Sequence, residues 1–209
     1  MKEKEPAVTR QTQDLLYQAL ETELGGVEIY RLALLCARND DLRQEWTRYL
    51  EQTRRHVEIV RGVFAALGLD PEATTPGRTI VRDKARGLLS AMQKALQDAP
   101  QAAQIVAAEC VVDAETKDHA NWQLIGAVAQ KATGAARRAL SDAHAQVEDE
   151  EDEHLYHTRG WCRELWLESL GLEAQIPPLE EREDVRSAAK AAEVQSDRKV
   201  QLLKKRRAG

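Results

Sequence analysis

A glutamate and a histidine three residues apart, Glu151-x-x-His154, form the pattern in this sequence best suited to chemistry. In an α-helix, residues three apart lie on one face about one turn apart, so this carboxylate and this imidazole can reach the same metal ion. Glutamate combined with histidine suits iron, manganese or zinc, and a carboxylate-rich site with few imidazoles favours iron or manganese over copper. The spacing therefore predicts a metal site on a helix.

Two further glutamates lie on apolar helical stripes in other parts of the chain. Charged side chains avoid the core-facing stripe of a helix unless they are paired or bind a metal. Glu23 shares its stripe with Leu20 and Val27, and Glu115 shares its stripe with Trp122. Both acids are therefore predicted to point inward, where they would converge with Glu151.

Between residues 42 and 67 the inward histidine is His56. Glu51 is five residues away and, at roughly 100° per residue, points about 140° away from it, so we predict that Glu51 faces away from the centre. The residue three before His56 is Thr53, which has no carboxylate. Asp118 or His119, each within a turn of Glu115, could supply a substitute ligand.

Ordinary structural roles are open for several of these residues. Glu23 could be a buried acid paired with Arg54 or Arg55, because buried charges are usually paired. A lone inward histidine is more often satisfied by hydrogen bonds in the core than bound to a metal. His144 and His157 are predicted to lie near the site without binding the ion. The other acids around Glu151 are predicted to form a solvated face: Glu148, Asp149, Asp152 and Glu153.

Composition and periodicity define the elements that must position these residues. Ala, Leu, Glu, Arg, Lys and Gln dominate the 209 residues, there is a single Phe, and the length suits one domain. Apolar periodicity predicts helices over residues 12–37, 42–67, 80–96, 102–131 and 136–170. Short turns make antiparallel hairpins of the first two and the last two, and a long crossover containing the shorter helix joins them. The predicted fold class is all-α.

The two ends of the chain differ from this helical body. Residues 1–11 are predicted to be an N-terminal extension, residues 12–176 the helical bundle, and residues 177–209 a charged tail that is flexible or an extended helix. The tail has few large apolar residues and cannot build a core of its own. A docking arm ending in Lys204-Lys205-Arg206-Arg207 is the alternative for this segment.

The overall charge and the cysteines limit the possible partners and the compartment. The net charge of -5 gives no basic field that would collect nucleic acid or an anionic membrane surface. No apolar run approaches the roughly 18 residues of a membrane span. Cys36, Cys110 and Cys162 lie far apart without CxxC spacing, so we expect reduced, mostly buried thiols and a cytoplasmic protein.

The two hairpins also match each other in sequence. Glu23 precedes Tyr30 by seven residues, Glu115 precedes Trp122 by seven, and each is followed by a helix with an inward histidine. This indicates an internal duplication in which Thr53 stands where the second half has a glutamate.

With these motifs the sequence resembles the ferritin-like superfamily, which has a glutamate on each first helix and Glu-x-x-His on each second helix. Within that superfamily it is similar to the bacterial YciF-type ferritin-like stress proteins over roughly residues 12–170. The likeness is carried by two segments, Thr53-x-x-His56-Val57-x-x-Val60-x-x-Val63-Phe64-x-x-Leu67-Gly68 and Glu115-x-x-Asp118-x-x-x-Trp122.

The resemblance implies a ferritin-like four-helix bundle with a di-iron or di-manganese centre, commonly in a homodimer or higher homo-oligomer. Carried over by position, the metal ligands are Glu23, His56, Glu115, Glu151 and His154. The departure at Thr53 removes one of the two carboxylates expected to bridge the metals. We therefore expect one or two ions, bound more tightly near His154 than near His56.

Three functional classes follow from this set of ligands. The first is an oxidoreductase that acts on iron, oxygen or peroxide in stress protection, and the second is a metal-binding protein without turnover. The third is a non-catalytic helical stress or interaction protein with a degenerate metal site, which the loss of a ligand at Thr53 favours. Whether the protein is an enzyme stays open at this point.

Overall fold

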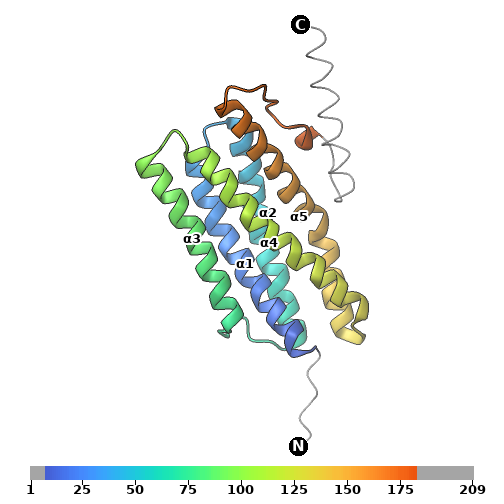
Figure 1. The fold of residues 1–209 in the computed structure, drawn as a ribbon. Helices are drawn as coiled ribbons and strands as arrows, with labels where there is room; N and C mark the ends of the chain where they lie inside the picture. The colour runs from blue at the N-terminus through green and yellow to red at the C-terminus, as the bar shows by residue number, and fades with distance from the viewer. Residues whose placement is uncertain (1–7, 183–209) are drawn as a thin grey trace, which may run out of the picture.

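The computed structural model describes residues 8–182, and the regular structure in this part of the chain is entirely helical (Figure 1). The predicted all-α class is confirmed, and all five predicted helices are present. They are α1 (Arg10–Cys36), α2 (Asp40–Leu67), α3 (Pro76–Asp98), α4 (Ala103–Lys131) and α5 (Gly134–Ser169), followed by a short 3-10 helix, η1 (Leu179–Arg182). None of the described helices combines enough length and hydrophobicity to span a bilayer.

The ends of the helices follow from local sequence. The side chains of Thr9, Asn39 and Thr75 each accept a hydrogen bond from the backbone N–H three residues on, which caps the starts of α1, α2 and α3. α3 begins at Pro76, four residues before the predicted start, because proline suits the first turn behind a threonine cap. Gly68 ends α2 in the left-handed conformation, with a φ of 70°.

The contacts between helices place α3 outside the other four. α1 contacts α2 and α4, and α5 contacts the same two helices, so these four long helices enclose a shared interior. α3 connects α2 to α4 and packs along the outside of α1 and α4, as Figure 1 shows. The order along the chain is therefore a helical pair, a crossover containing one helix, and a second helical pair.

A buried ion pair and a close approach attach α3 to α1. The guanidinium Nε atoms of Arg78 and Arg82 each donate to Glu21 at 2.6 Å, and Glu21 lies off the inward stripe of α1. At Gly25 an added Cβ would lie 2.9 Å from the Cβ of Ala85, so glycine allows the two helices to come together.

Two apolar clusters fill the ends of the interior, and a polar layer separates them. One cluster contains Trp46 and Trp161, and the other contains Leu20 and Phe64. The buried polar residues between the clusters lie near the middle of the four long helices, at positions 23, 53, 56, 115, 118, 151, 152 and 154. The sequence therefore interrupts each core stripe at the same level of the molecule.

The chain beyond α5 turns back onto that helix. Leu179 packs in a small cluster with Leu155 and Tyr156. Arg163 donates to both carboxylate oxygens of Glu180, at 2.7 and 2.9 Å, and Glu180 is 2% exposed. The described start of the predicted charged tail is thus packed on α5. Residues 1–7 of the predicted extension and 183–209 of the predicted tail lie outside the described residues.

The three cysteines occupy the part of the molecule near the first apolar cluster. Cys36 and Cys110 are buried and Cys162 is partly buried, and all three are free thiols. Burial raises the pKa of each thiol to about 11, which keeps it protonated and unreactive. The expectation of reduced, mostly buried thiols is confirmed.

Candidate metal centre

The five residues predicted as ligands come together in the polar layer. Each is at most 3% exposed. They form two groups of three that could each hold an ion: Glu23, His56 and Glu151 in one, and Glu115, Glu151 and His154 in the other. Within each group the ligand atoms all lie within 4.8 Å of one another. Glu23, Glu115 and Glu151 are all buried in this layer, as predicted, and Glu151 belongs to both groups. Glu23 and Glu115 fall in different groups, so the geometry offers two ion positions where the sequence predicted one common ion.

The spacing of the nitrogen and oxygen atoms suits shared coordination. Nδ1 of His56 lies 3.0 Å from Oε1 of Glu151 and 3.6 Å from Oε1 of Glu23. Nδ1 of His154 lies 3.6 Å from both Oε2 of Glu115 and Oε1 of Glu151. Ligand atoms about 2 Å from one ion lie roughly 3 to 4 Å from each other, so these separations need little adjustment.

Several atoms at this centre are buried without a hydrogen-bond partner among residues 8–182. They are Glu23 Oε2, His56 Nδ1, Glu115 Oε2, Asp118 Oδ1, Glu151 Oε2 and His154 Nδ1. Buried polar atoms are nearly always satisfied, because leaving one unpaired costs about 1 to 3 kcal/mol. The two Nδ1 atoms have carboxylate oxygens within 3.6 Å, but outside hydrogen-bond geometry. Cations held in the two groups of three would give the ligand atoms of those groups a partner.

The Nε2 atom of each of these two histidine rings has a hydrogen-bond partner. Nε2 of His56 lies 2.8 Å from Glu150 Oε2, and Nε2 of His154 lies 3.0 Å from Gln52 Oε1. An oxygen acceptor at Nε2 places the proton there and leaves Nδ1 of the neutral ring as the free ligand atom. Sequence reasoning missed both partners, although each is adjacent to a residue of interest: Glu150 precedes Glu151, and Gln52 precedes Thr53.

Comparisons with protein-family models, with curated proteins and with solved structures found no match for this chain. The chemistry of the site therefore has to be inferred from its own atoms. A buried set of glutamates with two imidazoles, each hydrogen-bonded through its outer nitrogen, could hold divalent cations.

Aromatic side chains close the centre from both ends. Trp122 donates its indole N–H to Glu23 Oε1 at 2.8 Å, so it orients a ligand as well as filling the core. The ring of Tyr49 lies 4.2 Å from the ring of His154, and its hydroxyl is 2.8 Å from Nδ1 of His157. His157 is thus near the site but outside both groups, as expected.

The alternative pairing of Glu23 with an arginine is wrong. Arg54 and Arg55 are both exposed, and Arg55 instead forms an ion pair with Glu150. Glu51 is exposed, which confirms that it faces away from the centre.

Of the two possible substitute ligands, only Asp118 faces the centre. Burial and the charges of Glu23, Glu151 and Glu115 raise the pKa of the Asp118 carboxyl well above its usual range. It is 4% exposed, although it belongs to neither group of three.

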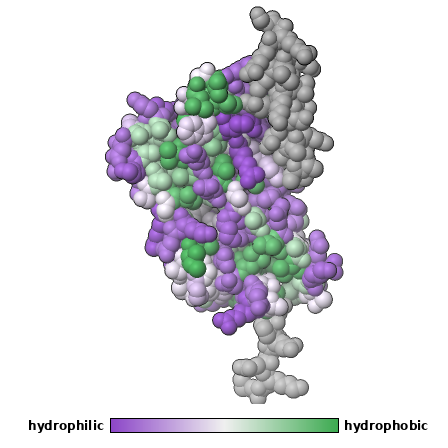
Figure 2. All heavy atoms as spheres, in the orientation of Figure 1, coloured by the Kyte–Doolittle hydropathy of each residue, from purple (hydrophilic) through white to green (hydrophobic). Residues whose placement is uncertain are grey.

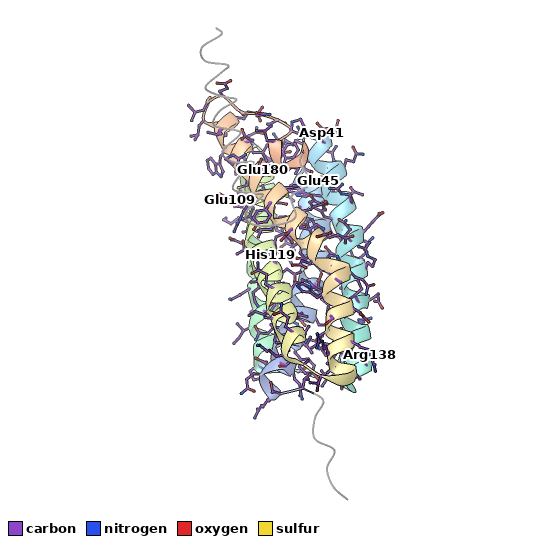
Figure 3. All side chains as sticks on the ribbon, turned by 90° about the vertical axis from the view of Figure 1, so that its right-hand side faces the viewer. Asp41, Glu45, Glu109, His119, Arg138 and Glu180 are labelled. Atoms are coloured by element: carbon purple, nitrogen blue, oxygen red, sulfur yellow. The ribbon has the colours of Figure 1, made fainter. Side chains whose placement is uncertain are left out.

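His119 lies about half-way along α4 in Figure 3, outside the centre. Its Nδ1 is 3.2 Å from Oδ1 of Asp152. The prediction that Asp152 is solvated is wrong, because the α4–α5 contact leaves it only 5% exposed. Burial, together with the charges of Glu148 and Asp149, raises the pKa of Asp152 to about 7.

The buried carboxylates at the centre outnumber the histidines, and this excess of negative charge shifts the pKa values of the ligands. Burial, together with the charges of Glu115 and Glu23, raises the pKa of Glu151 to about 7, although its contact with His56 opposes this. Burial lowers the pKa of His56, but Glu23, Glu150 and Glu151 outweigh it and raise that pKa well above its usual range. Glu151 and His56 therefore hold protons that a divalent cation would displace.

The metal-free protein is expected to lose stability as the pH rises from about 5 to 8. Glu151 has an ordinary pKa of 4.5 and a folded pKa of about 7, so its contribution is complete below pH 4.5 and is lost as the pH rises through about 7. The raised pKa of His56 acts in the same direction above its ordinary value of 6.5. Glu150, with a pKa lowered to about 2, titrates below this range.

Thermal unfolding in the presence of a chelator measures this effect. We expect the Tm to fall by roughly 5 to 10 °C across the range, and to change less after Glu151→Gln. With Mn(II) added, the trend should flatten or reverse, because ions bind the deprotonated ligands. A Tm of the chelated protein that does not depend on pH would contradict these pKa directions.

Proposed function

We propose that this protein is a ferritin-like metal-binding protein that holds a pair of iron or manganese ions between α1, α2, α4 and α5. The observation that carries the proposal is the set of buried, unpaired ligand atoms around Glu151, with Nδ1 of both histidines facing inward. A purely structural ion-pair network would also need partners for Glu23 Oε2, Glu115 Oε2 and Glu151 Oε2, and none of these has a hydrogen bond among residues 8–182.

The arrangement of helices supports the same proposal. Two contacting helical pairs joined by a crossover are the connectivity expected for a ferritin-like bundle, whose ligands project inward from all four long helices. The same class implies a homodimer or higher homo-oligomer in the cytoplasm, which we include in the proposal.

The ligand geometry favours two positions over one. If each helical hairpin supplied the ligands of one ion, the first hairpin would offer only Glu23 and His56. That count predicts weak binding at the position near His56. In the folded chain Glu151 belongs to both groups, so each position has three candidate ligands. We therefore propose that Glu151 would be a ligand shared by both ions, and that Thr53 would make the His56 position the weaker one without emptying it.

A redox-active pair bound here would supply electrons to dioxygen or peroxide, or take them from ferrous iron. The chain's own residues prepare the site for such a reaction. Glu150 and Gln52 fix the rings of His56 and His154. Asp118, buried beside the ligands, keeps a proton at the centre because its pKa is raised. On this proposal the protein is an oxidoreductase that handles iron, oxygen or peroxide under stress.

A second candidate function is a non-catalytic helical stress or interaction protein with a degenerate metal site. Thr53 favours it, since its neutral hydroxyl, which donates to the backbone oxygen of Tyr49 at 2.8 Å, offers an ion no negative charge. The two functions differ in metal binding and in turnover.

Anaerobic titration with Fe(II) or Mn(II) is the test of the metal centre. We expect about two ions per chain in the wild type, and about one in each of His56→Ala and His154→Ala, with His56→Ala retaining the tighter ion. His144→Ala is the matched control, because His144 lies on α5 beside Glu148, outside both groups. Absence of binding in the wild type would support the degenerate site.

Turnover is then measured separately on the Fe(II)-loaded protein. Consumption of oxygen or peroxide that depends on both histidines supports the oxidoreductase. Tight binding without consumption supports a metal-binding protein without turnover.

A further inference from the structure

A groove on the outer surface lies between the crossover helix α3 and helix α4, with α1 as its floor. Its volume is about 350 Å³, within the range of sites for small organic ligands. The lining is Thr22 and Ile29 from α1, Val81, Lys84, Ala85, Gly87 and Leu88 from α3, and Asp113, Ala114 and Lys117 from α4. Figure 2, drawn in the orientation of Figure 1, shows hydrophobic residues among hydrophilic ones over these helices.

The groove is open because of its small residues. Gly87 is exposed, and a Cβ added there would meet no atom within 4 Å. The small side chains of Ala85 on α3 and Ala114 on α4 extend little into the groove. Ile29, Val81 and Leu88 supply its apolar surface. The result is a cleft between two helices that the described side chains do not fill.

Two ammonium groups border this apolar surface from opposite walls. Lys84 comes from α3 and Lys117 from α4, and neither forms an ion pair with any carboxylate in residues 8–182. Lys117 is partly buried and donates to Oδ1 of Asn121, which in turn is hydrogen-bonded to Thr22 in the floor. Burial lowers the pKa of Lys117, and the charge of Lys84 lowers it further, although Asp118 opposes both.

We propose that this groove binds an aliphatic carboxylate of medium chain length, with its chain on the apolar floor and its carboxylate between Lys84 and Lys117. An anion between the two ammonium groups relieves their repulsion and forms charge-assisted hydrogen bonds with both. The apolar lining selects a ligand with a hydrocarbon chain over a small inorganic anion. Asp113 also lines the groove, but it forms no ion pair with either lysine in the described chain, so both ammonium groups are available.

Calorimetric titration of the full chain with butanoate, hexanoate, octanoate and decanoate, below their micelle concentrations, is the test. Affinity should rise by up to about fourfold per added CH₂ until the groove is filled. Decanol, which has the same chain without the charge, should bind at least roughly tenfold more weakly than decanoate.

Variants separate the charge from the apolar floor. Lys84→Met should weaken decanoate binding about tenfold and leave decanol binding unchanged. Gly87→Leu should weaken binding of both at least roughly tenfold, because a leucine side chain there would take up part of the groove. Lys94→Met is the matched control on α3, since Lys94 is paired with Asp98 and lies outside the groove. Metal content, measured in parallel, reports whether the centre is intact.

Three results would overturn the proposal. Equal binding of decanol and decanoate would remove the role of the lysines. Binding of decanoate that is not weakened by Gly87→Leu would place it elsewhere. A change of oligomeric state in Gly87→Leu, seen by light scattering, would show that a second copy of the chain covers this face.

Discussion

Glu151→Gln is expected to abolish tight metal binding at both positions and, at the same time, to stabilise the metal-free protein. Binding should weaken by at least roughly 100-fold at each position, because the only residue shared by both groups loses its charge. The metal-free protein should gain on the order of 1 to 3 kcal/mol, because the buried charge that Glu115 and Glu23 repel is gone. Function and stability are thus opposed at this residue.

Two measurements test this pair of effects on the same samples. Elemental analysis and calorimetry give the metal content and affinity, and urea unfolding with a chelator gives the free energy of unfolding. Glu148→Gln is the matched control, since Glu148 lies one turn away on α5 and its side chain is 56% exposed. If Glu151→Gln loses one ion and keeps the other at wild-type affinity, Glu151 does not bridge.

Thr53→Glu should produce the opposite combination. The new carboxylate would lie one turn from His56, in the same relation as Glu151 to His154, and should tighten the weaker position by roughly 10- to 100-fold. Without metal it adds another buried charge to a centre already rich in acids, so the free energy of unfolding should fall by about 2 to 4 kcal/mol. Metal should therefore stabilise this variant much more than the wild type.

Thr53→Gln separates charge from size, because glutamine has nearly the same volume and no charge. Thr53 packs closely against Gly26, since a Cβ added at Gly26 would lie only 3.2 Å from Thr53 Cγ2. The larger glutamine should therefore lower the free energy of unfolding, and it should not raise the affinity for metal. If Thr53→Gln and Thr53→Glu bind metal equally, the carboxylate does not reach the centre.

The five candidate ligands could be found from the sequence because a charged residue on an apolar stripe is rare. Glu23, Glu115 and Glu151 each break a stripe near the middle of a helix, and periodicity alone gives the direction in which they point. The helices themselves were predictable for the same reason, since their apolar stripes and their Gly, Pro and Asn boundaries are clear.

Residues on the flanks of a stripe could not be placed in this way. Gln52 and Glu150 support the histidines, and Asp152 is buried, but each is polar and lies beside the inward line. Whether such a residue is buried depends on which helix lies next to it and how closely the two helices pack. The periodicity of one helix gives no information about its neighbours. Tyr49 lies on the inward line of α2 and is buried, but its contact with His157 on α5 could not be predicted, because it depends on how the two helices pack.

The two apolar clusters on either side of the polar layer bear on how an ion would enter the proposed centre. Each cluster takes residues from all four long helices, so each can tie the helices together while the layer between them is empty of cations. In this respect the chain differs from a zinc finger, whose folding free energy is the binding free energy of its ion. If the proposed centre binds metal, we expect the chain to fold first and be loaded afterwards, so that its metal content would follow the supply of ions in the cell and not the rate of synthesis.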